Sequence, residues 1–399
     1  MRNREQSSSN KEQAENRHPG SVLQKIVILG REHANSHPGA AFSAAAGTDT
    51  PPTIQEKSCL VDQNHVWWII SLLLTSALII AGCTGKAPTD LVVVSKYADQ
   101  EIKVDGLAYE SVWKEAPTVV IPTKGGPDVK VKSFYSDKRI NFFISWPDST
   151  KNDVSKVWEF DGTSWKNGPD QDKLAILWNK GDSVAYFDIK GCGATCHAEN
   201  DDKDLWYMAT NSRKEKTDLW FWLAGICNTT KYVSDRLLDD TVDATLPKAA
   251  RKQDKGEVGF LKNGYKTPVE RIAPSRPTLK LNKALTVENR PYPLQAEMED
   301  ITFYKDFKAG NQEPFVYFTG PPTESQADVK GQAVWKDGRW YLEMSRKLDT
   351  KYKDDMPFVP DSGASVYYMF GLMVSNHTEP PPIKHLTSGP VTLEMAPKP

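Results

Sequence analysis

The chain has 399 residues, enough for one large domain or two smaller ones in addition to an export signal. Its formal net charge is −2, so it lacks the basic excess by which a nucleic-acid-binding protein is recognised. No internal repeat, P-loop or GxGxxG motif occurs, which leaves no sequence signal for a nucleotide-binding enzyme.

The first segment, residues 1–65, is polar and rich in Asn, Ser, Gln, Glu and Pro, a composition typical of disorder. No methionine lies between Met1 and Met208, so a mis-assigned translation start is an alternative explanation of this extension. We therefore exclude it from the prediction of the fold.

Residues 66–82 form an uncharged apolar run, which is short for a membrane span but suits the apolar core of a signal peptide. The run ends in Ile80-Ala81-Gly82-Cys83, which has the form of a lipobox. We expect a lipoprotein signal over 66–83, with lipidation of Cys83 anchoring the exported protein at the periplasmic face of a bacterial membrane. Thr84 favours the outer membrane. A single signal-anchor helix is the alternative.

Residues 84–99 are expected to be a linker. After the linker, apolar residues recur with a period of two in several segments. Such alternation predicts strands joined as hairpins at 129–136 with 139–146, at 173–178 with 183–189, and on both sides of Asp337-Gly338 in 332–348. Late strands are expected at 365–374 and 390–395. Helical periodicity is scarce, so the sequence predicts an all-β fold, an antiparallel β-sandwich, over 100–396.

Residues 224–300 interrupt this pattern, because they are charged, contain prolines and have weak periodicity. We expect a long irregular insertion with few short helices, near 231–240 and 245–252. A second domain at this place is the alternative.

The chemistry is concentrated in Cys192-Gly193-Ala194-Thr195-Cys196-His197. Covalent haem c is attached through Cys-x-x-Cys-His, and the spacer here is one residue longer. Zinc would require a second pair of ligands, and none is present at suitable spacing. The motif therefore predicts one haem c, held by Cys192 and Cys196, with its iron bound by His197. A redox-active thiol pair, another metal or a disulfide are the alternatives.

Beyond Cys83 the chain contains three histidines, His197, His377 and His385. His377 lies in a polar Asn-His-Thr segment and is expected to be solvated, whereas Met373 lies in an apolar strand and is expected to be in the core. Tryptophans form a further group that either lines the haem or fills the core: Trp206, Trp220, Trp222, Trp335 and Trp340.

Several segments resemble the haem-binding gamma subunit of ethylbenzene dehydrogenase and its relatives. They are VDGLAYESVWKEAPTVVIP (104–122), FFISWPDST (142–150), DSVAYFDI (182–189) and WYMATNSRKEKTDLWFWLA (206–224). The resemblance covers about 100–395 apart from 224–300. It implies a sandwich of the immunoglobulin-like or carbohydrate-binding-module-like kind, with haem at one edge. In b-type members a Met and a C-terminal Lys bind the iron, and these roles fall on Met208 and Lys384. The added thiols and His197 imply c-type attachment instead, with His385 as the distal ligand and Met208 or Lys384 as alternatives.

These features predict an electron-transfer protein rather than an enzyme, because iron with six ligands has no open position for substrate. The implied partners are redox proteins, either subunits of a periplasmic molybdenum oxidoreductase or other cytochromes. A non-catalytic binding module and a haem-based sensor on the same fold are the alternatives.

Overall fold

The computed structural model describes residues 90–197, 207–241, 250–265, 274–375 and 386–399. These belong to the unit Ala81–Pro399, whereas the other unit, Met1–Ile80, lies outside the described residues. The predicted extension 1–65 and the lipoprotein signal 66–83 with Cys83 therefore remain predictions. No helix in the described ranges is long and apolar enough to cross a membrane.

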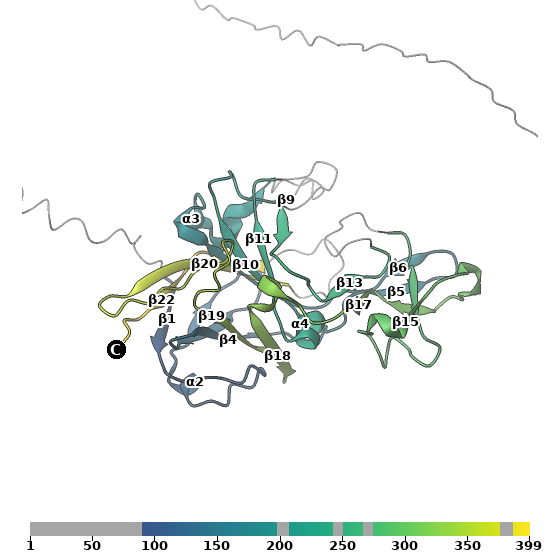
Figure 1. The fold of residues 1–399 in the computed structure, drawn as a ribbon, viewed down its shortest axis with the longest axis horizontal. Helices are drawn as coiled ribbons and strands as arrows, with labels where there is room; N and C mark the ends of the chain where they lie inside the picture. Colours follow the sequence, from purple (N-terminus) through teal and green to yellow (C-terminus); the bar gives the residue numbers. More distant parts are fainter. Residues whose placement is uncertain (1–89, 198–206, 242–249, 266–273, 376–385) are drawn as a thin grey trace, which may run out of the picture. The chain divides into compact units, whose positions relative to one another are not determined.

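Most of the described strands belong to one large sheet (Figure 1). Its strands follow the order β12 (Arg251–Gln253), β11 (Ser234–Leu238), β10 (Thr217–Leu223), β7 (Lys173–Asn179), β20 (Val366–Ser375), β22 (Val391–Met395), β1 (Val92–Tyr97), β3 (Val129–Tyr135), β4 (Arg139–Pro147), β19 (Arg339–Lys347) and β18 (Lys330–Lys336). Two short strands extend it, β2 (Val119–Ile121) beside β3 and β21 (Leu386–Thr387) beside β20.

The two ends of this strand order meet. Tyr232, just before β11, forms an antiparallel bridge with Lys330 of β18, and the N–H of Val233 donates to the carbonyl of Val329 at 2.8 Å. The sheet is therefore curled, with the β10–β7–β20 half facing the β4–β19 half.

Aromatic side chains fill the space between these halves. Trp222 of β10 lies 5.1 Å from Trp340 of β19 and 5.7 Å from Trp146 of β4, as measured between ring centroids. Phe142 of β4 contacts Trp178 of β7 in the same way, at 5.9 Å. All five side chains are fully buried, so edge-on and tilted aromatic packing forms the centre of a sandwich-like core.

The all-β sandwich prediction is confirmed, and the sheet is mixed rather than purely antiparallel. Strand β1 runs parallel to both of its neighbours, β22 and β3, whereas the other ladders of this sheet are antiparallel. The prediction of a linker over 84–99 is therefore wrong for residues 92–97. Val93 and Ser95 of this strand are completely buried because the strand lies between two others.

Two predicted hairpins, β3–β4 and β18–β19, and two predicted strands, β20 and β22, are confirmed. The turn residues Asp337 and Gly338 both have positive φ, 52° and 71°, as a tight two-residue hairpin requires. The predicted strand at 183–189 is wrong. It contains a turn and the short helix α3 (Phe187–Lys190), because Tyr186 is left-handed at φ 60° and the buried Val184 and Phe187 are three residues apart.

The segment 224–300 contributes to the main sheet as well as covering it. The helix expected at 231–240 is wrong, since residues 234–238 form β11, which follows the helix α4 (Ala224–Thr230). Other strands form small separate sheets: β13 (Phe260–Lys262) with β17 (Val316–Phe318), β14 (Leu279–Leu281) with β15 (Met298–Asp300), and β16 (Gln312–Pro314) with β5 (Val157–Phe160) and β6 (Trp165–Asn167).

Short helical turns complete the described elements. They are α2 (Val112–Glu115) and the 3-10 helices η1 (Lys180–Asp182), η2 (Gly191–Thr195), η4 (Gln295–Glu297), η5 (Tyr304–Asp306) and η6 (Glu324–Ala327). Of these, η2 and η6 contribute to the sites described below.

Candidate functional site

The two thiols of the Cys192–Cys196 motif are brought together by a tight turn. Cys192 lies in η2, and the hydroxyl of Thr195 donates to its carbonyl at 3.1 Å. The N–H of Cys196 donates to the carbonyl of Gly193, so the chain turns back between the two cysteines. Cys192 is buried, Cys196 is half-buried, and neither forms a disulfide. The extra spacer residue is thus accommodated by one turn of 3-10 helix.

Two glycines allow this turn to lie directly on the sheet. A Cβ atom on Gly371 of β20 would lie 2.4 Å from the backbone nitrogen of Cys192. A Cβ atom on Gly191, whose φ is +54°, would lie 2.5 Å from the carbonyl carbon of Gly389. Only glycine permits such close approach of backbone to backbone. The motif is therefore packed between β20 and the turn that follows β21.

His197 continues into a small antiparallel ladder. Strand β8 (Cys196–His197) pairs with β9 (Tyr207–Met208), which places Met208 opposite Cys196 and Tyr207 opposite His197. The imidazole stacks on the Tyr207 ring at 4.9 Å, and its Nε2 lies 3.0 Å from the carbonyl oxygen of Ala209. A carbonyl only accepts, so Nε2 carries the proton and Nδ1 carries the lone pair. One nitrogen fixed by a carbonyl and one with a lone pair is the usual arrangement of a metal-binding histidine.

The environment of Cys192 disfavours a redox-active thiol pair. Burial and the neighbouring Cys196 raise the pKa of the Cys192 thiol far above its ordinary value. Reactive thiols need a depressed pKa and some exposure, because the thiolate is the nucleophile. The third described cysteine, Cys227, is a core residue whose sulfur accepts the N–H of Leu223 at 3.2 Å.

The predicted haem contact Trp220 points away from this motif. In the register of β20, β7 and β10, Gly371 is level with Leu177 and Leu219, so these residues share the face on which Cys192 lies. Successive residues alternate between faces. Trp220 therefore faces the opposite side, into the core, where its ring packs 5.8 Å from that of Phe142.

The other tryptophans and Met373 also belong to the core or its border. Trp222 and Trp340 are buried in it, and Trp335 packs against it. Met373 is buried as expected. The remaining predicted candidates lie outside the described residues: Trp206, His377, Lys384 and His385.

The described chain resumes at Leu386, immediately after Lys384 and His385 in the sequence. Leu386 begins β21, which contacts η2. Met208, which pairs with Cys196 across the β8–β9 ladder, is half-buried and packs against the main core. The described parts of the chain that adjoin the candidate iron ligands thus lie around the cysteine motif.

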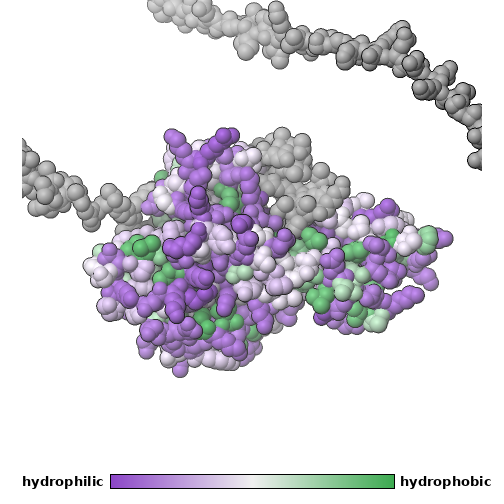
Figure 2. All heavy atoms as spheres, in the orientation of Figure 1, coloured by the Kyte–Doolittle hydropathy of each residue, from purple (hydrophilic) through white to green (hydrophobic). Residues whose placement is uncertain are grey.

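Two large apolar side chains are exposed directly before the motif. Tyr186 is 67% exposed and Ile189, on α3, is 70% exposed. On the face drawn in Figure 2, hydrophilic side chains cover most of the surface, with smaller hydrophobic areas between them. Exposed apolar groups beside the site are suited to contact with a cofactor or a protein partner.

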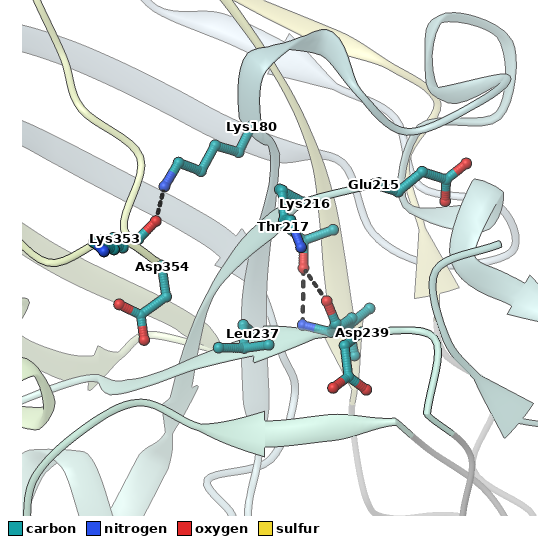
Figure 3. A pocket seen from close by; sticks show the side chains of 9 residues that line it. Lys180, Glu215, Lys216, Thr217, Leu237, Asp239, Lys353 and Asp354 are labelled. Carbon is teal, nitrogen blue, oxygen red and sulfur yellow. Dashed lines mark hydrogen bonds between the residues drawn. The ribbon is translucent and has the colours of Figure 1, made fainter. Parts of the chain in front are cut away.

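A separate hollow of about 380 Å³ lies beside β10 and β11 (Figure 3). Lysines and acids both line it, and Thr217 closes one side through hydrogen bonds with the backbone of Leu238. The lining residues are Lys180, Glu215, Lys216, Thr217, Leu237, Leu238, Asp239, Lys353 and Asp354. The hollow contains neither Cys192, Cys196 nor His197, so it is distinct from the candidate haem site.

Comparison with known proteins supports a family assignment. The family model described as ethylbenzene dehydrogenase matches residues 110–368, and no curated protein matches the chain. Solved structures that match include a family 9 carbohydrate binding module from Caldicellulosiruptor kristjanssonii in complex with cellotriose, at 7% identity, with 77% of this chain and 95% of that chain covered and a TM-score of 0.30. A putative carbohydrate-binding protein from Bacteroides uniformis matches at 10% identity, with 77% and 100% covered and a TM-score of 0.34.

Proposed function

The chain belongs to the ethylbenzene dehydrogenase family, and from this we propose that it is an exported c-type cytochrome that transfers single electrons for a redox partner. The partner of this proposal is a periplasmic oxidoreductase such as a molybdenum enzyme, or another cytochrome. The chain itself is proposed to carry electrons and not to catalyse a reaction.

One observation carries the proposal. Cys192 and Cys196, neither of which forms a disulfide, lie at a single turn that is packed against β20 through Gly371, and the imidazole of His197 follows directly. The donor set fits haem c, because two thiols are the groups that form thioether bonds and an adjacent imidazole binds iron. Cys192 is 3% exposed, so its sulfur can reach a porphyrin only while this turn is not packed on β20.

In this proposal Cys192 and Cys196 hold the porphyrin and His197 supplies the first iron ligand. The haem supplies a reversible one-electron iron couple. His385 is proposed as the second ligand, with Met208 and Lys384 as alternatives. The contact between β21 and η2 supports a C-terminal ligand, and the pairing of Met208 with Cys196 keeps Met208 as a candidate.

Location and anchoring complete the proposal. Lipidation of Cys83 would hold the protein at the periplasmic face of a bacterial membrane, in the outer membrane in preference to the inner one. The exposed Tyr186 and Ile189 beside the motif would then be available to the cofactor or to a partner.

The test is a pyridine haemochrome spectrum of protein made in a host with c-type maturation machinery. We expect one haem c per chain that stays with the polypeptide after extraction with acidified solvent. Cys192→Ala together with Cys196→Ala should release it, whereas Cys227→Ala, which removes a buried cysteine elsewhere, should not. Extraction of haem from the unsubstituted protein would contradict covalent attachment.

The second ligand is tested by the optical spectrum of the oxidised protein. With His197 and His385 as ligands, the weak far-red sulfur-to-iron charge-transfer band is absent. Presence of the band, and its loss in Met208→Leu, would assign the position to Met208 instead.

A further inference from the structure

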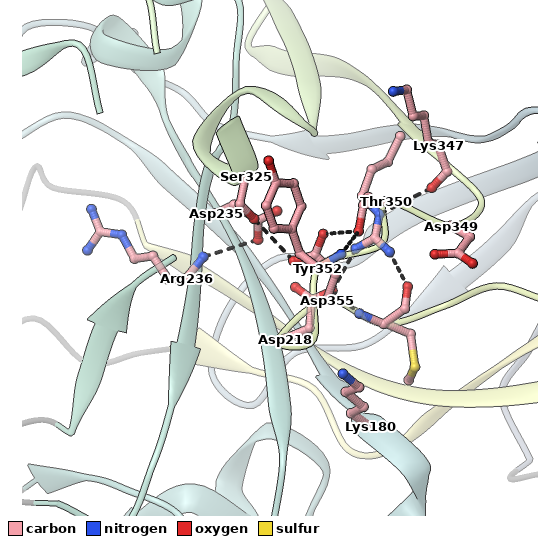
Figure 4. Close-up of polar contacts among 12 residues, drawn as sticks. Lys180, Asp218, Asp235, Arg236, Ser325, Lys347, Asp349, Thr350, Tyr352 and Asp355 are labelled. Atoms are coloured by element: carbon pink, nitrogen blue, oxygen red, sulfur yellow. Dashed lines mark hydrogen bonds and ion pairs between the residues drawn. The ribbon is translucent and has the colours of Figure 1, made fainter. Parts of the chain in front are cut away.

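A group of buried carboxyl side chains lies away from the cysteine motif, at the β10–β11–β12 edge of the sheet. Asp218, Asp235 and Asp355 are labelled in Figure 4, and Asp254 follows β12. Their exposed fractions are 1%, 0%, 2% and 5% respectively. One carboxylate oxygen from each of Asp235, Asp254 and Asp355 lies within 4.8 Å of the other two. Carboxyl groups are almost never buried together in this way without a partner.

The hydrogen bonds leave several of these oxygens without a donor. Asp235 accepts the N–H of Arg236 at 3.1 Å through Oδ1, but its Oδ2 has no partner. Both carboxylate oxygens of Asp254 are buried and accept no hydrogen bond. Asp355 accepts from the hydroxyls of Ser325 and Thr350. Asp254 is therefore a buried, unpartnered group with an oxygen directed at two other carboxylates.

The positive charge nearby is insufficient to balance the group. The buried guanidinium of Arg346 lies 2.7 Å from Oδ2 of Asp218, which also accepts the N–H of Met356. Oδ1 of Asp218 has no partner. Four ionised carboxylates against one guanidinium would leave three negative charges unbalanced in the interior. Each such charge would cost several kcal/mol.

We propose that Asp235, Asp254 and Asp355 bind a divalent cation, and that the cation is calcium. The donors are all hard oxygens, which calcium prefers, and the described cluster includes no histidine or cysteine that would favour zinc. Calcium–oxygen bonds of about 2.4 Å keep the ligand oxygens of one ion within about 4.8 Å of one another, and these three oxygens meet that condition. Asp218 Oδ1 is a further unpartnered oxygen of the same buried group.

The proposed ion would join segments that are distant in the chain. Asp235 lies in β11, Asp254 follows β12, and Asp355 lies in the connection between β19 and β20. Gln326 of η6 already donates to the carbonyls of Asp235 and Asp254, at 2.6 and 3.1 Å. Calcium would therefore fix the loop around residue 355 to the edge of the sheet, as a structural site independent of the haem.

Protons are the competing means of neutralising the group, since burial and the carboxyls of Asp218, Asp354 and Asp355 raise the pKa of Asp254 to about 9. Measurements of calcium content and of stability on the exported full chain distinguish neutralisation by calcium from neutralisation by protons. After desalting, elemental analysis should find one calcium per chain. Chelation should lower the melting temperature by about 5 °C, and calcium chloride should restore it whereas magnesium chloride should not. Absence of calcium together with an unchanged melting temperature in both salts would overturn the proposal.

Terbium provides a second measurement that needs no variant. Trp220 lies near the cluster, since the Arg346 guanidinium that binds Asp218 is 5.1 Å from its ring centroid. Light absorbed by this tryptophan should sensitise bound terbium, and calcium should displace the signal. Terbium luminescence that calcium leaves unchanged would count against the site.

The variant Asp254→Asn separates the two conditions. In chelator it should leave the melting temperature close to that of the unsubstituted protein, because without the ion Asp254 has no ligand role to lose. In calcium it should lower it, because a ligand is lost. Asp349→Asn changes an exposed carboxyl on the loop that holds Asp355, paired with Lys351, and is the control that should behave alike in both conditions. Equal effects of calcium on Asp254→Asn and on the unsubstituted protein would exclude Asp254 as a ligand.

Discussion

The substitution Gly371→Ala tests whether the cysteine motif is packed as closely on β20 as the structure has it. The new Cβ would lie 2.4 Å from the backbone nitrogen of Cys192, 2.9 Å from its Cβ and 3.1 Å from its Cα. Ordinary contacts begin at 3.4 Å, so η2 and β20 must separate by about 1 Å. The atoms in contact are two backbone atoms and the Cβ of Cys192, whose positions the backbone fixes, so they cannot rotate away as the end of a flexible side chain can.

The expected loss of stability follows from this overlap. Overpacking of a buried site typically costs about 1–3 kcal/mol. We expect Gly371→Ala to lower the free energy of unfolding by about this amount in urea denaturation followed by tryptophan fluorescence. If the motif carries haem, the yield of covalently attached haem should fall as well, because the displaced thiols meet the porphyrin in the wrong position.

Gly389→Ala is the matched control, since a Cβ there would meet nothing within 4 Å. It lies in the turn that Gly191 contacts, so it probes the same region without the overlap. A change within about 0.5 kcal/mol is expected for it. Equal stability of the two variants would refute the close packing of Cys192 on β20.

Three further predictions concern other parts of the fold. Arg346→Met should lower the free energy of unfolding by about 3–5 kcal/mol, measured by urea denaturation in chelator, because it leaves Asp218 unpaired. Adding Asp218→Asn should recover most of this loss. No recovery in the double variant would contradict the pairing. Gly338→Ala should lower the free energy of unfolding by about 1–2 kcal/mol through the positive φ alone, because the nearest atom to the new methyl group, the carbonyl oxygen of Asp148, is 3.9 Å away. An unchanged stability would argue against this turn geometry. Burial raises the pKa of Glu313 from 4.5 to about 7, so the folded state holds its proton more tightly and stability should fall as pH rises from about 4.5 to 7. Glu313→Gln should flatten this dependence, and an unchanged pH profile would show that Glu313 does not cause it.

The elements that could be predicted from the sequence are those whose signal is local. Asp337-Gly338 specifies a two-residue turn by itself, and the alternating residues on both sides pair with each other. Strand β1 lacks such a signal, because its partner β22 lies about 300 residues later and runs parallel to it. The segment 183–189 alternates like a strand, but its buried residues Val184 and Phe187 are three apart, which is the spacing of a turn.

The same distinction applies to the sites. The six residues of the cysteine motif are contiguous and could be recognised directly, whereas Gly371, which receives the motif, lies in a strand far along the chain. A single glycine within a strand pattern does indicate that another segment of backbone approaches closely, but it does not identify that segment. Asp235, Asp254 and Asp355 are separated by 19 and 101 positions, and only the curled sheet brings them together.

The measurement that tests the central claim most directly is mass spectrometry of the proteolytic peptide containing residues 192–197, from protein exported by a host able to attach haem c. Covalent attachment predicts a peptide heavier by one haem, with both cysteines protected from alkylation. A peptide of unmodified mass with two alkylated thiols would contradict it, and the proposed electron transfer through this turn would then have no cofactor.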